Sequence, residues 1–376
     1  MLSEALRDRD HLFASLWGLW VYHLVRAEMA TALNRSENML RVALAHADIP
    51  EELAEAYSAV GLTKVFQGQL VEAVDDLNKG IEAYNRMTKD PQNLLLRLDP
   101  KVQCLSMLER AHYFMGRPNE AIALGEQAVE HAIKLKQPYS IAFAKMFLSY
   151  IHYFRGDMRA AVQLGTEAVH LAESQGLQQV LAWAVVGTHR ALGANEEQRA
   201  GSIMEIRKTV EALEVAGARV CCPQFVAMLC ELLIQNGNFT DAEQEIDRGI
   251  SISETTGNRD YLAELLRLKA HVMVARNVKG TAHDEPTKLL NQAAAISFDQ
   301  GALSHTLRIL TSQVALDTGT RRERQSRQKL KGALARMPNA SEQKSGDYAL
   351  ALDVLRMPPG SGTKAKDWWQ RLLVRC

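Results

Sequence analysis

Two stretches of this chain are nearly identical and lie one fixed interval apart. Ala111–Gly116 reads AHYFMG and Ile151–Gly156 reads IHYFRG, and the second glycine follows the first by 40 residues. Five residues after each glycine comes an alanine, Ala121 or Ala161. A fixed period in this range is typical of stacked helical repeats. Glycine ends a helix because it tolerates a left-handed backbone, and a small alanine allows the next helix to pack closely. The stretch therefore predicts a repeating hairpin of two antiparallel helices.

The same spacing recurs elsewhere, at Gly68 with Ala73 and at Gly237 with Ala242. We expect an all-α fold, a right-handed superhelical solenoid of about eight antiparallel hairpins with repeats of about 40 residues. The solenoid with a capping helix is predicted to span residues 1–356. Residues 357–376 are predicted to form a flexible linker and a tail, because they begin with a stretch rich in proline and glycine. Residues 90–100 are predicted to form a longer connection, since Gly116 follows Gly68 by 48 residues.

The composition restricts the classes of partner. The 376 residues carry 44 basic and 44 acidic side chains, so the formal charge is zero, whereas a nucleic-acid-binding protein usually has a basic surplus. No apolar run is long enough to span a membrane, and the N-terminus has no apolar core of a signal peptide. The odd set of five cysteines suggests reduced thiols. We expect a cytoplasmic protein with no membrane partner and no specific nucleic-acid partner.

The sequence offers no convincing catalytic or metal site. His112 and His152 occupy equivalent positions, but one repeat separates them by about 10 Å, too far for both to bind one ion. Cys221, Cys222 and Cys230 lack a fourth ligand for zinc. We therefore expect no metal, no cofactor and no catalytic activity, and an enzyme with its site in a solenoid pocket is the least favoured hypothesis.

The candidate binding residues are aromatic and polar side chains on the first helix of each hairpin. In a stacked array these helices line the concave side, where aromatic and arginine side chains make good anchors. For about half of the set, packing between repeats is the alternative explanation. The candidates are Tyr57, Lys64, Gln103, Arg110, Phe143, Phe147, Tyr150, Trp183, Arg190, Gln224, Tyr261, Glu264 and Arg267.

The centre of this predicted site is Phe147, Tyr150, Trp183 and Arg190. Phe143, Phe147 and Tyr150 follow one another at helical spacing and form a single stripe, which is either core or an anchor surface. Arg190 follows Trp183 by two helical turns and is expected to be exposed on the same face. An arginine there would suit a carboxylate or a phosphate of the ligand.

One local excess of charge stands out. Residues 321–336 carry seven basic side chains and one acidic side chain. Such a run is either the solvated face of an outer helix or a contact for an acidic partner. The role of this run, and of Trp368 and Trp369 in the tail, stays open.

At the level of family, the glycine and alanine spacing resembles tetratricopeptide repeats in a lengthened form. The chain also resembles the C-terminal repeat region of bacterial signalling proteins that join an adenylate cyclase or a DNA-binding module to a STAND-type ATPase. The matching stretches are Leu16–Val21, Gln137–Phe143, Ala263–Lys269 and Ser304–Leu316.

This resemblance implies a sensor or interaction arm that recognises a protein, a peptide or a small effector in its concave groove. No phosphate-binding loop precedes the repeats in this sequence. The chain is therefore expected to be either a stand-alone arm or an excised one. The alternative function is a regulatory subunit that associates with itself, so a homo-oligomer is possible.

Overall fold

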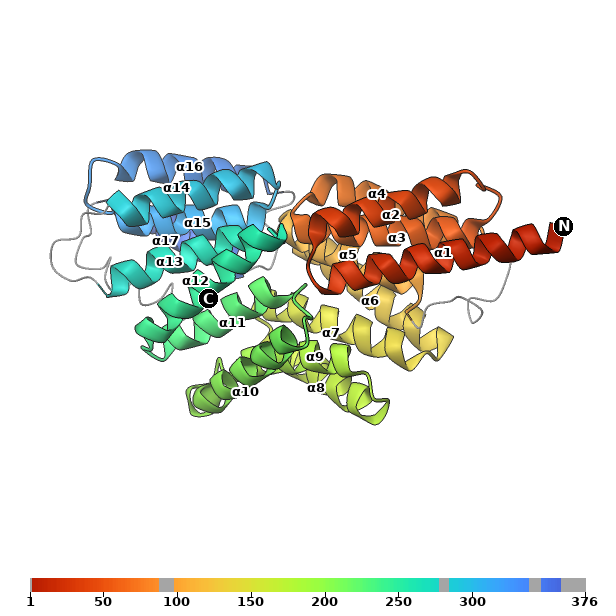
Figure 1. Cartoon of the computed structure of the whole chain (residues 1–376). Coiled ribbons are helices and arrows are strands. Elements are labelled where there is room, and N and C mark those ends of the chain that lie inside the picture. Colours follow the sequence, from red (N-terminus) through yellow and green to blue (C-terminus); the bar gives the residue numbers. More distant parts are fainter. Residues whose placement is uncertain (1, 88–97, 277–283, 338–345, 360–376) are drawn as a thin grey trace.

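The computed structural model describes residues 2–87, 98–276, 284–337 and 346–359, with side chains from Leu12 onward. These residues form seventeen helices and no strand. The chain is an all-α superhelical solenoid of TPR-like antiparallel hairpins, as predicted (Figure 1). None of the described helices is both long and apolar enough to cross a bilayer. Most of the predicted 90–100 connection and, from residue 360, the tail with Trp368 and Trp369 lie outside the described residues.

The helices alternate between an inner and an outer position along the superhelix. The inner helices are α1 (Leu2–Val25), α3 (Pro50–Gln67), α5 (Pro100–Phe114), α7 (Pro138–Arg155), α9 (Gln178–Leu192), α11 (Cys222–Gln235), α13 (Leu262–Ala275) and α15 (Leu303–Asp317). Their outer partners are α2 (Met29–Leu44), α4 (Leu70–Tyr84), α6 (Pro118–Leu135), α8 (Met158–Ser174), α10 (Glu196–Val215), α12 (Phe239–Thr256), α14 (Asp284–Asp299) and α16 (Glu323–Ala335). The last helix, α17 (Gly346–Arg356), packs on α15 and α7.

Burial explains the alternation. Helix α8 buries one narrow stripe of small residues at helical spacing, Ala161, Gly165, Ala168 and Ala172, and exposes its other faces. Helix α7 buries residues on almost every side. A helix with one apolar stripe covers a core, whereas a helix that is apolar all round lies inside it.

The two glycines that set the repeat are in the predicted turns. Gly116 and Gly156 have φ values of 81° and 87°, a left-handed conformation that a Cβ disfavours. Each turn leads into the next helix of the hairpin, α6 or α8. The prediction from the 40-residue period is confirmed at both positions.

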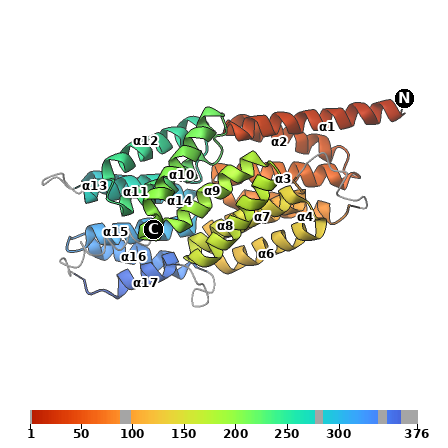
Figure 2. The ribbon, with the colours of Figure 1, turned by 90° about the horizontal axis from the view of Figure 1, so that it is seen from below.

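The superhelix closes on itself, so that its second turn packs against its first (Figures 1 and 2). The backbone N–H groups of Arg219 and Val220, just before α11, donate to the carbonyl of Val25 at the end of α1. Nine helices, α2 to α10, therefore lie between the two partners. We call this line of contacts between successive turns the seam.

The seam continues with the same stagger. The N–H groups of Arg259 and Asp260, just before α13, donate to the carbonyl of Phe66 in α3. The hydroxyl of Ser304 in α15 donates to the carbonyl of Tyr113 in α5 at 2.7 Å. Because the turns bond to each other in this way, most of the concave side becomes interior.

Candidate functional site

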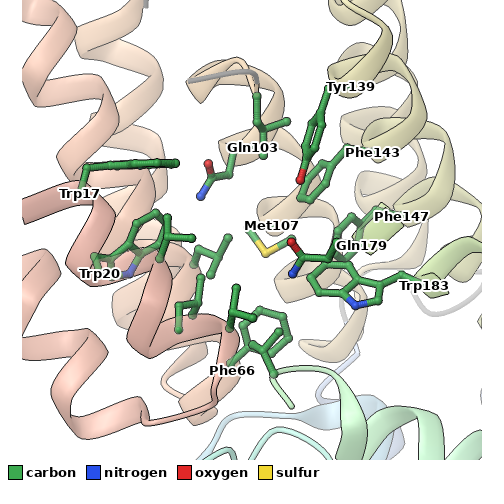
Figure 3. A pocket seen from close by; sticks show the side chains of 16 residues that line it. Trp17, Trp20, Phe66, Gln103, Met107, Tyr139, Phe143, Phe147, Gln179 and Trp183 are labelled. Atoms are coloured by element: carbon green, nitrogen blue, oxygen red, sulfur yellow. The ribbon is translucent and has the colours of Figure 1, made fainter. Parts of the chain in front are cut away.

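A cavity of about 400 Å³ lies where five inner helices and the loop before α11 converge (Figure 3). We call it the aromatic pocket. Among the described residues, no side chain that lines it is acidic, basic or histidine. The lining residues are Trp17, Trp20, Val21, Leu24 and Val25 of α1, Leu62 and Phe66 of α3, Leu98, Gln103 and Met107 of α5 and its approach, Tyr139, Phe143 and Phe147 of α7, Gln179 and Trp183 of α9, and Val220.

Aromatic rings form two opposite walls of the pocket. Trp17 and Trp20 come from α1, and the facing wall carries Phe143, Phe147 and Trp183 (Figure 3). The indole N–H of Trp20 donates to the Thr63 hydroxyl of α3 at 2.9 Å, which fixes its ring. The centroids of Phe143 and Phe147 lie 4.8 Å apart, and Trp183 meets Phe147 edge-on at 6.4 Å. Such contacts hold the walls in defined positions.

Two glutamine amides are the main polar groups of the pocket. The head groups of Gln103 and Gln179 point into it in Figure 3. Gln103 is only 3% exposed, and no hydrogen bond joins either amide to another group among the described residues. Each amide therefore has donors and an acceptor free for a bound molecule.

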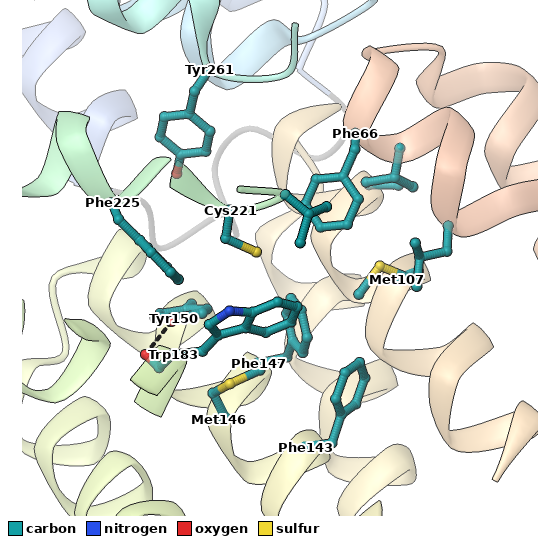
Figure 4. Packing of buried hydrophobic residues seen from close by; sticks show 14 of the residues in the cluster. Phe66, Met107, Phe143, Met146, Phe147, Tyr150, Trp183, Cys221, Phe225 and Tyr261 are labelled. Atoms are coloured by element: carbon teal, nitrogen blue, oxygen red, sulfur yellow. Dashed lines mark hydrogen bonds between the residues drawn. The ribbon is translucent and has the colours of Figure 1, made fainter. Parts of the chain in front are cut away.

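Two further aromatic residues, Tyr150 and Phe225, lie behind Trp183 and support it (Figure 4). The hydroxyl of Tyr150 donates to the Trp183 carbonyl at 2.5 Å, and the Phe225 ring meets the indole edge-on at 6.5 Å. Gly187 leaves room for Tyr150, since a Cβ there would collide with the phenol ring. Tyr150 thus positions the pocket wall without lining it.

The expectation that Arg190 is exposed beside these aromatics is wrong. Arg190 is 1% exposed, its Nε donates to Glu231 at 2.8 Å, and its guanidinium lies over the Tyr153 ring. The helical spacing does place Arg190 on an inner face, but α11, the inner helix of the next hairpin, places Glu231 against it. Phe147, Tyr150 and Trp183 are brought together, and Arg190 belongs to a separate cluster.

That cluster is a buried ion network of three arginines and three carboxylates. Arg190 pairs with Glu231, while Arg110 forms a separate buried pair with Asp260 at 2.5 Å. The other members are Arg267, Arg308, Glu264 and Asp347: Arg267 pairs with Glu264 at 2.5 Å, and Arg308 contacts Glu231, Glu264 and Asp347 at 3.4, 2.9 and 2.8 Å. Opposite charges in equal number compensate the burial of each group.

The network and the separate pair of Arg110 with Asp260 account for five further candidates. Gln224 accepts a hydrogen bond from Arg110 at 2.8 Å, and Tyr261 lies under the Arg110 guanidinium. Burial would raise the pKa of Glu264, but Arg267 and Arg308 hold it below its ordinary value. Arg110, Gln224, Glu264 and Arg267 are almost fully buried, which corrects the expectation that they are exposed in a groove.

Tyr57 and Lys64 are absent from both the pocket and the network. Lys64 reaches outward from α3 to Asp76 of α4 at 2.6 Å. Tyr57 is half-buried, with its Cβ beside Gly80 of α4. Both side chains contribute to packing within one hairpin.

Sequence reasoning missed several residues of both sites. Glu231 stands alone inside the apolar run Phe225–Ile234, and that isolated charge was a usable signal of a buried partner. Trp17 and Trp20 were visible as an aromatic pair in the first helix. Gln179 and Asp260 gave no local signal, because only the tertiary arrangement places them.

The histidines and cysteines suggested by the sequence lie apart from the pocket. His112 bonds to Glu120 of its own hairpin at 2.9 Å, and burial lowers its pKa. Cys104, Cys221, Cys222 and Cys230 are free and buried, and burial raises the pKa of Cys222 to about 12. Within the described ranges no group of three or more His, Cys, Asp or Glu side chains has metal-binding geometry.

Comparison with known proteins supports the fold. No family model matches the chain. A Rap protein complexed with competence and sporulation factor superposes with a TM-score of 0.56 at 11% identity, covering 89% of this chain and 98% of that one. Aspartyl phosphate phosphatase F from Bacillus subtilis gives 0.48 at 11% identity, with 88% and 94% covered. The first likeness shows a shared helical-repeat fold.

Two further similarities are more restricted. A STAND protein with a tetratricopeptide repeat sensor from Pyrococcus horikoshii gives a TM-score of 0.43 at 11% identity, covering 82% of this chain and 49% of that one. A clustered mitochondria protein homolog from Culex quinquefasciatus is 32% identical over 96 residues. That match covers 24% of this chain and 6% of the mosquito protein.

Proposed function

We propose that this chain is a non-catalytic binding module and that the aromatic pocket is its ligand site. The observation that carries this proposal is a preformed, largely apolar cavity with two unpaired amides. Ligand sites are typically concave, mostly apolar and equipped with a few placed polar groups. The pocket lining contains no serine, cysteine, histidine, lysine or carboxylate to act as a nucleophile or base.

The pocket replaces the wider groove that the sequence suggested. It keeps Phe147 and Trp183 as anchors and adds Trp17 and Trp20, whereas the network around Arg190 is filled by its own ion pairs. In the Rap protein a similar fold is found complexed with competence and sporulation factor. By analogy, we propose that this module senses a peptide or a small effector within a cytoplasmic bacterial signalling system.

The test uses N-phenyl-1-naphthylamine, an uncharged probe whose fluorescence rises in apolar sites. Val21→Trp would fill the pocket and should weaken probe binding about tenfold or more. The control is Val71→Trp, which adds the same side chain at a 60% exposed position on α4 and should leave binding unchanged. Equal binding to the wild type and to a folded Val21→Trp variant would refute the pocket as the ligand site.

Self-association is the second candidate function. Leu12, Leu19 and Tyr22 lie on one stripe of α1 and are 50%, 44% and 56% exposed. Exposed apolar side chains that adjoin one another favour an interface. Native mass spectrometry of the purified chain separates the two functions, since a discrete oligomer supports self-association and a retained small ligand supports the pocket.

A further inference from the structure

We propose that the aromatic pocket recognises an uncharged ligand that carries an amide group on an apolar body. This inference rests on the proposed function and names the chemical class of the ligand. It follows from three properties of the pocket: its lack of charge, its aromatic walls and its two unpaired glutamines.

The absence of charge on the pocket lining selects against ions. An ionised carboxylate, phosphate or amine in this cavity would lose its hydration without meeting an opposite charge. The charges of the buried ion network are already balanced internally. A neutral ligand is therefore favoured over a charged ligand of the same shape.

The apolar walls define the body of the ligand. Trp17 and Trp20 face Phe143, Phe147 and Trp183 across the pocket, so a ring or a branched alkyl group between them is covered on both sides (Figure 3). A cavity of about 400 Å³ is within the range of pockets that bind small molecules. The same space accepts one or two apolar side chains of a peptide.

The glutamines define the polar group of the ligand. Gln103 is almost completely buried with its head group directed at the cavity, so a ligand that displaces water from this amide must replace its hydrogen bonds. An amide of the ligand offers one N–H and one C=O, which match the acceptor and the donors of a glutamine side chain. A hydroxyl, a ketone or an ether would satisfy only part of this set.

Gln103 and Gln179 reach the pocket from different repeats. Gln103 lies on α5 and Gln179 at the start of α9, with the aromatic residues of α7 between these helices. A ligand that bonds to both therefore bridges three successive hairpins. One amide suffices for one glutamine, and a ligand with two amides, such as a short peptide, engages both.

The experiment compares three ligands of one shape: 4-phenylbutyramide, 4-phenylbutyrate and butylbenzene. Binding is followed by tryptophan fluorescence, because Trp17, Trp20 and Trp183 line the pocket and the phenyl ligands do not absorb at the excitation wavelength. The amide should bind about tenfold or more tightly than the acid. An acid that binds as tightly as the amide would overturn the proposal.

The variants Gln103→Leu and Gln179→Leu remove one amide each. Because 4-phenylbutyramide has one amide, one of the two variants, and the double variant, should weaken its binding about fivefold or more while butylbenzene binding stays within twofold. The control is Gln178→Leu, an exposed position next to Gln179 that does not line the pocket, and it should change neither ligand. Should Gln103→Leu fail to fold, Gln103→Met, which removes the amide but keeps the length of the side chain, takes its place.

The possible failures are distinguishable. In the first case, N-phenyl-1-naphthylamine and butylbenzene bind, but neither glutamine variant changes the preference for 4-phenylbutyramide over butylbenzene. Amide recognition is then refuted, and the proposed function stands. If no probe binds, both are refuted. Competition by acetyl-Leu-Phe-Leu-amide identifies peptides as the source of the amide, whereas binding of 4-phenylbutyramide without such competition identifies small molecules.

Discussion

Polar residues on the inner helices of this solenoid have two different surroundings. Arg190 donates to Glu231 at 2.8 Å, and Glu231 also meets Tyr153 and Arg308, so that both charges are compensated inside the protein. Gln103 is equally buried but directs an unpaired amide into a cavity. Sequence position alone does not separate the two cases, since Arg190, Glu231 and Gln103 all occupy first helices of their hairpins. At the scale of residues, the distinction depends on what the neighbouring inner helices place opposite each side chain.

The burial of Arg190 leads to a stability prediction. Arg190→Ala should lower the free energy of unfolding by about 3–5 kcal/mol, because Glu231 would lose one of its two guanidinium partners inside the protein. Chemical denaturation measures the change. The matched control is Arg159→Ala, an exposed arginine on α8, with an expected change within about 0.5 kcal/mol. A stable Arg190→Ala variant would show that the network is not closed around this residue.

At the scale of elements, small residues set how closely each pair of helices packs. Gly165 lies against Thr188 of α9, and Gly125 lies against Glu109 of α5, in both cases with no room for a Cβ. Outer helices therefore approach inner ones through a stripe of alanine and glycine. This close approach gives the hairpins a regular stacking, which in turn gives the superhelix a regular stagger.

The two turn glycines provide a matched test of this packing. Gly156→Ala should lower the free energy of unfolding by about 1 kcal/mol because its φ is positive. The added Cβ contributes no clash, since no atom lies within 4 Å of it. Gly116→Ala should cost more, because its Cβ also approaches Leu303 of α15 to 2.9 Å. Gly332→Ala, in the open middle of α16, should stabilise by about 0.5–1 kcal/mol. If both substitutions lower the free energy of unfolding equally, the contact with Leu303 across the seam does not restrict the turn at Gly116.

At the scale of the whole molecule, the seam converts an open array into a closed one. The carbonyls at the ends of α1 and α3 bond to the loops before α11 and α13, and Arg110 of α5 pairs with Asp260 across the same boundary. The aromatic pocket adjoins this boundary, because Val25, Phe66 and Val220 belong to both. Occupation of the pocket is therefore expected to stabilise the closed superhelix.

Hydrogen exchange tests the seam. The backbone amides at 219–220 and 259–260 lie outside helices but should exchange slowly, since they are bonded across turns. Asp260→Asn removes the charge partner of Arg110 and should speed exchange at both sites by about tenfold or more. The turn at Gly237 bonds only within its own hairpin and serves as the control, with an unchanged rate. Faster exchange at Gly237 as well would indicate general unfolding instead of opening of the seam.

The sequence by itself determined the repeat, the hairpin and the helical class. These features depend on short-range physics: Gly116 and Gly156 end helices because of their own backbone freedom, and Ala121 and Ala161 permit close packing with the adjacent helix. The same local logic placed Phe147 and Trp183 on inner faces. It also placed Arg190 there, but could not show what lies opposite.

Only the tertiary structure decided which inner residues face a ligand and which face each other. Glu231 is 41 residues from Arg190 and meets it on the next inner helix, whereas Asp260 is 150 residues from Arg110, so that second pairing depends on how tightly the superhelix winds. Winding is the sum of many small rotations between hairpins, and no single residue encodes it. The aromatic pocket exists because α1 and the loop at Val220 close over α7 and α9, a contact that repeat spacing does not contain.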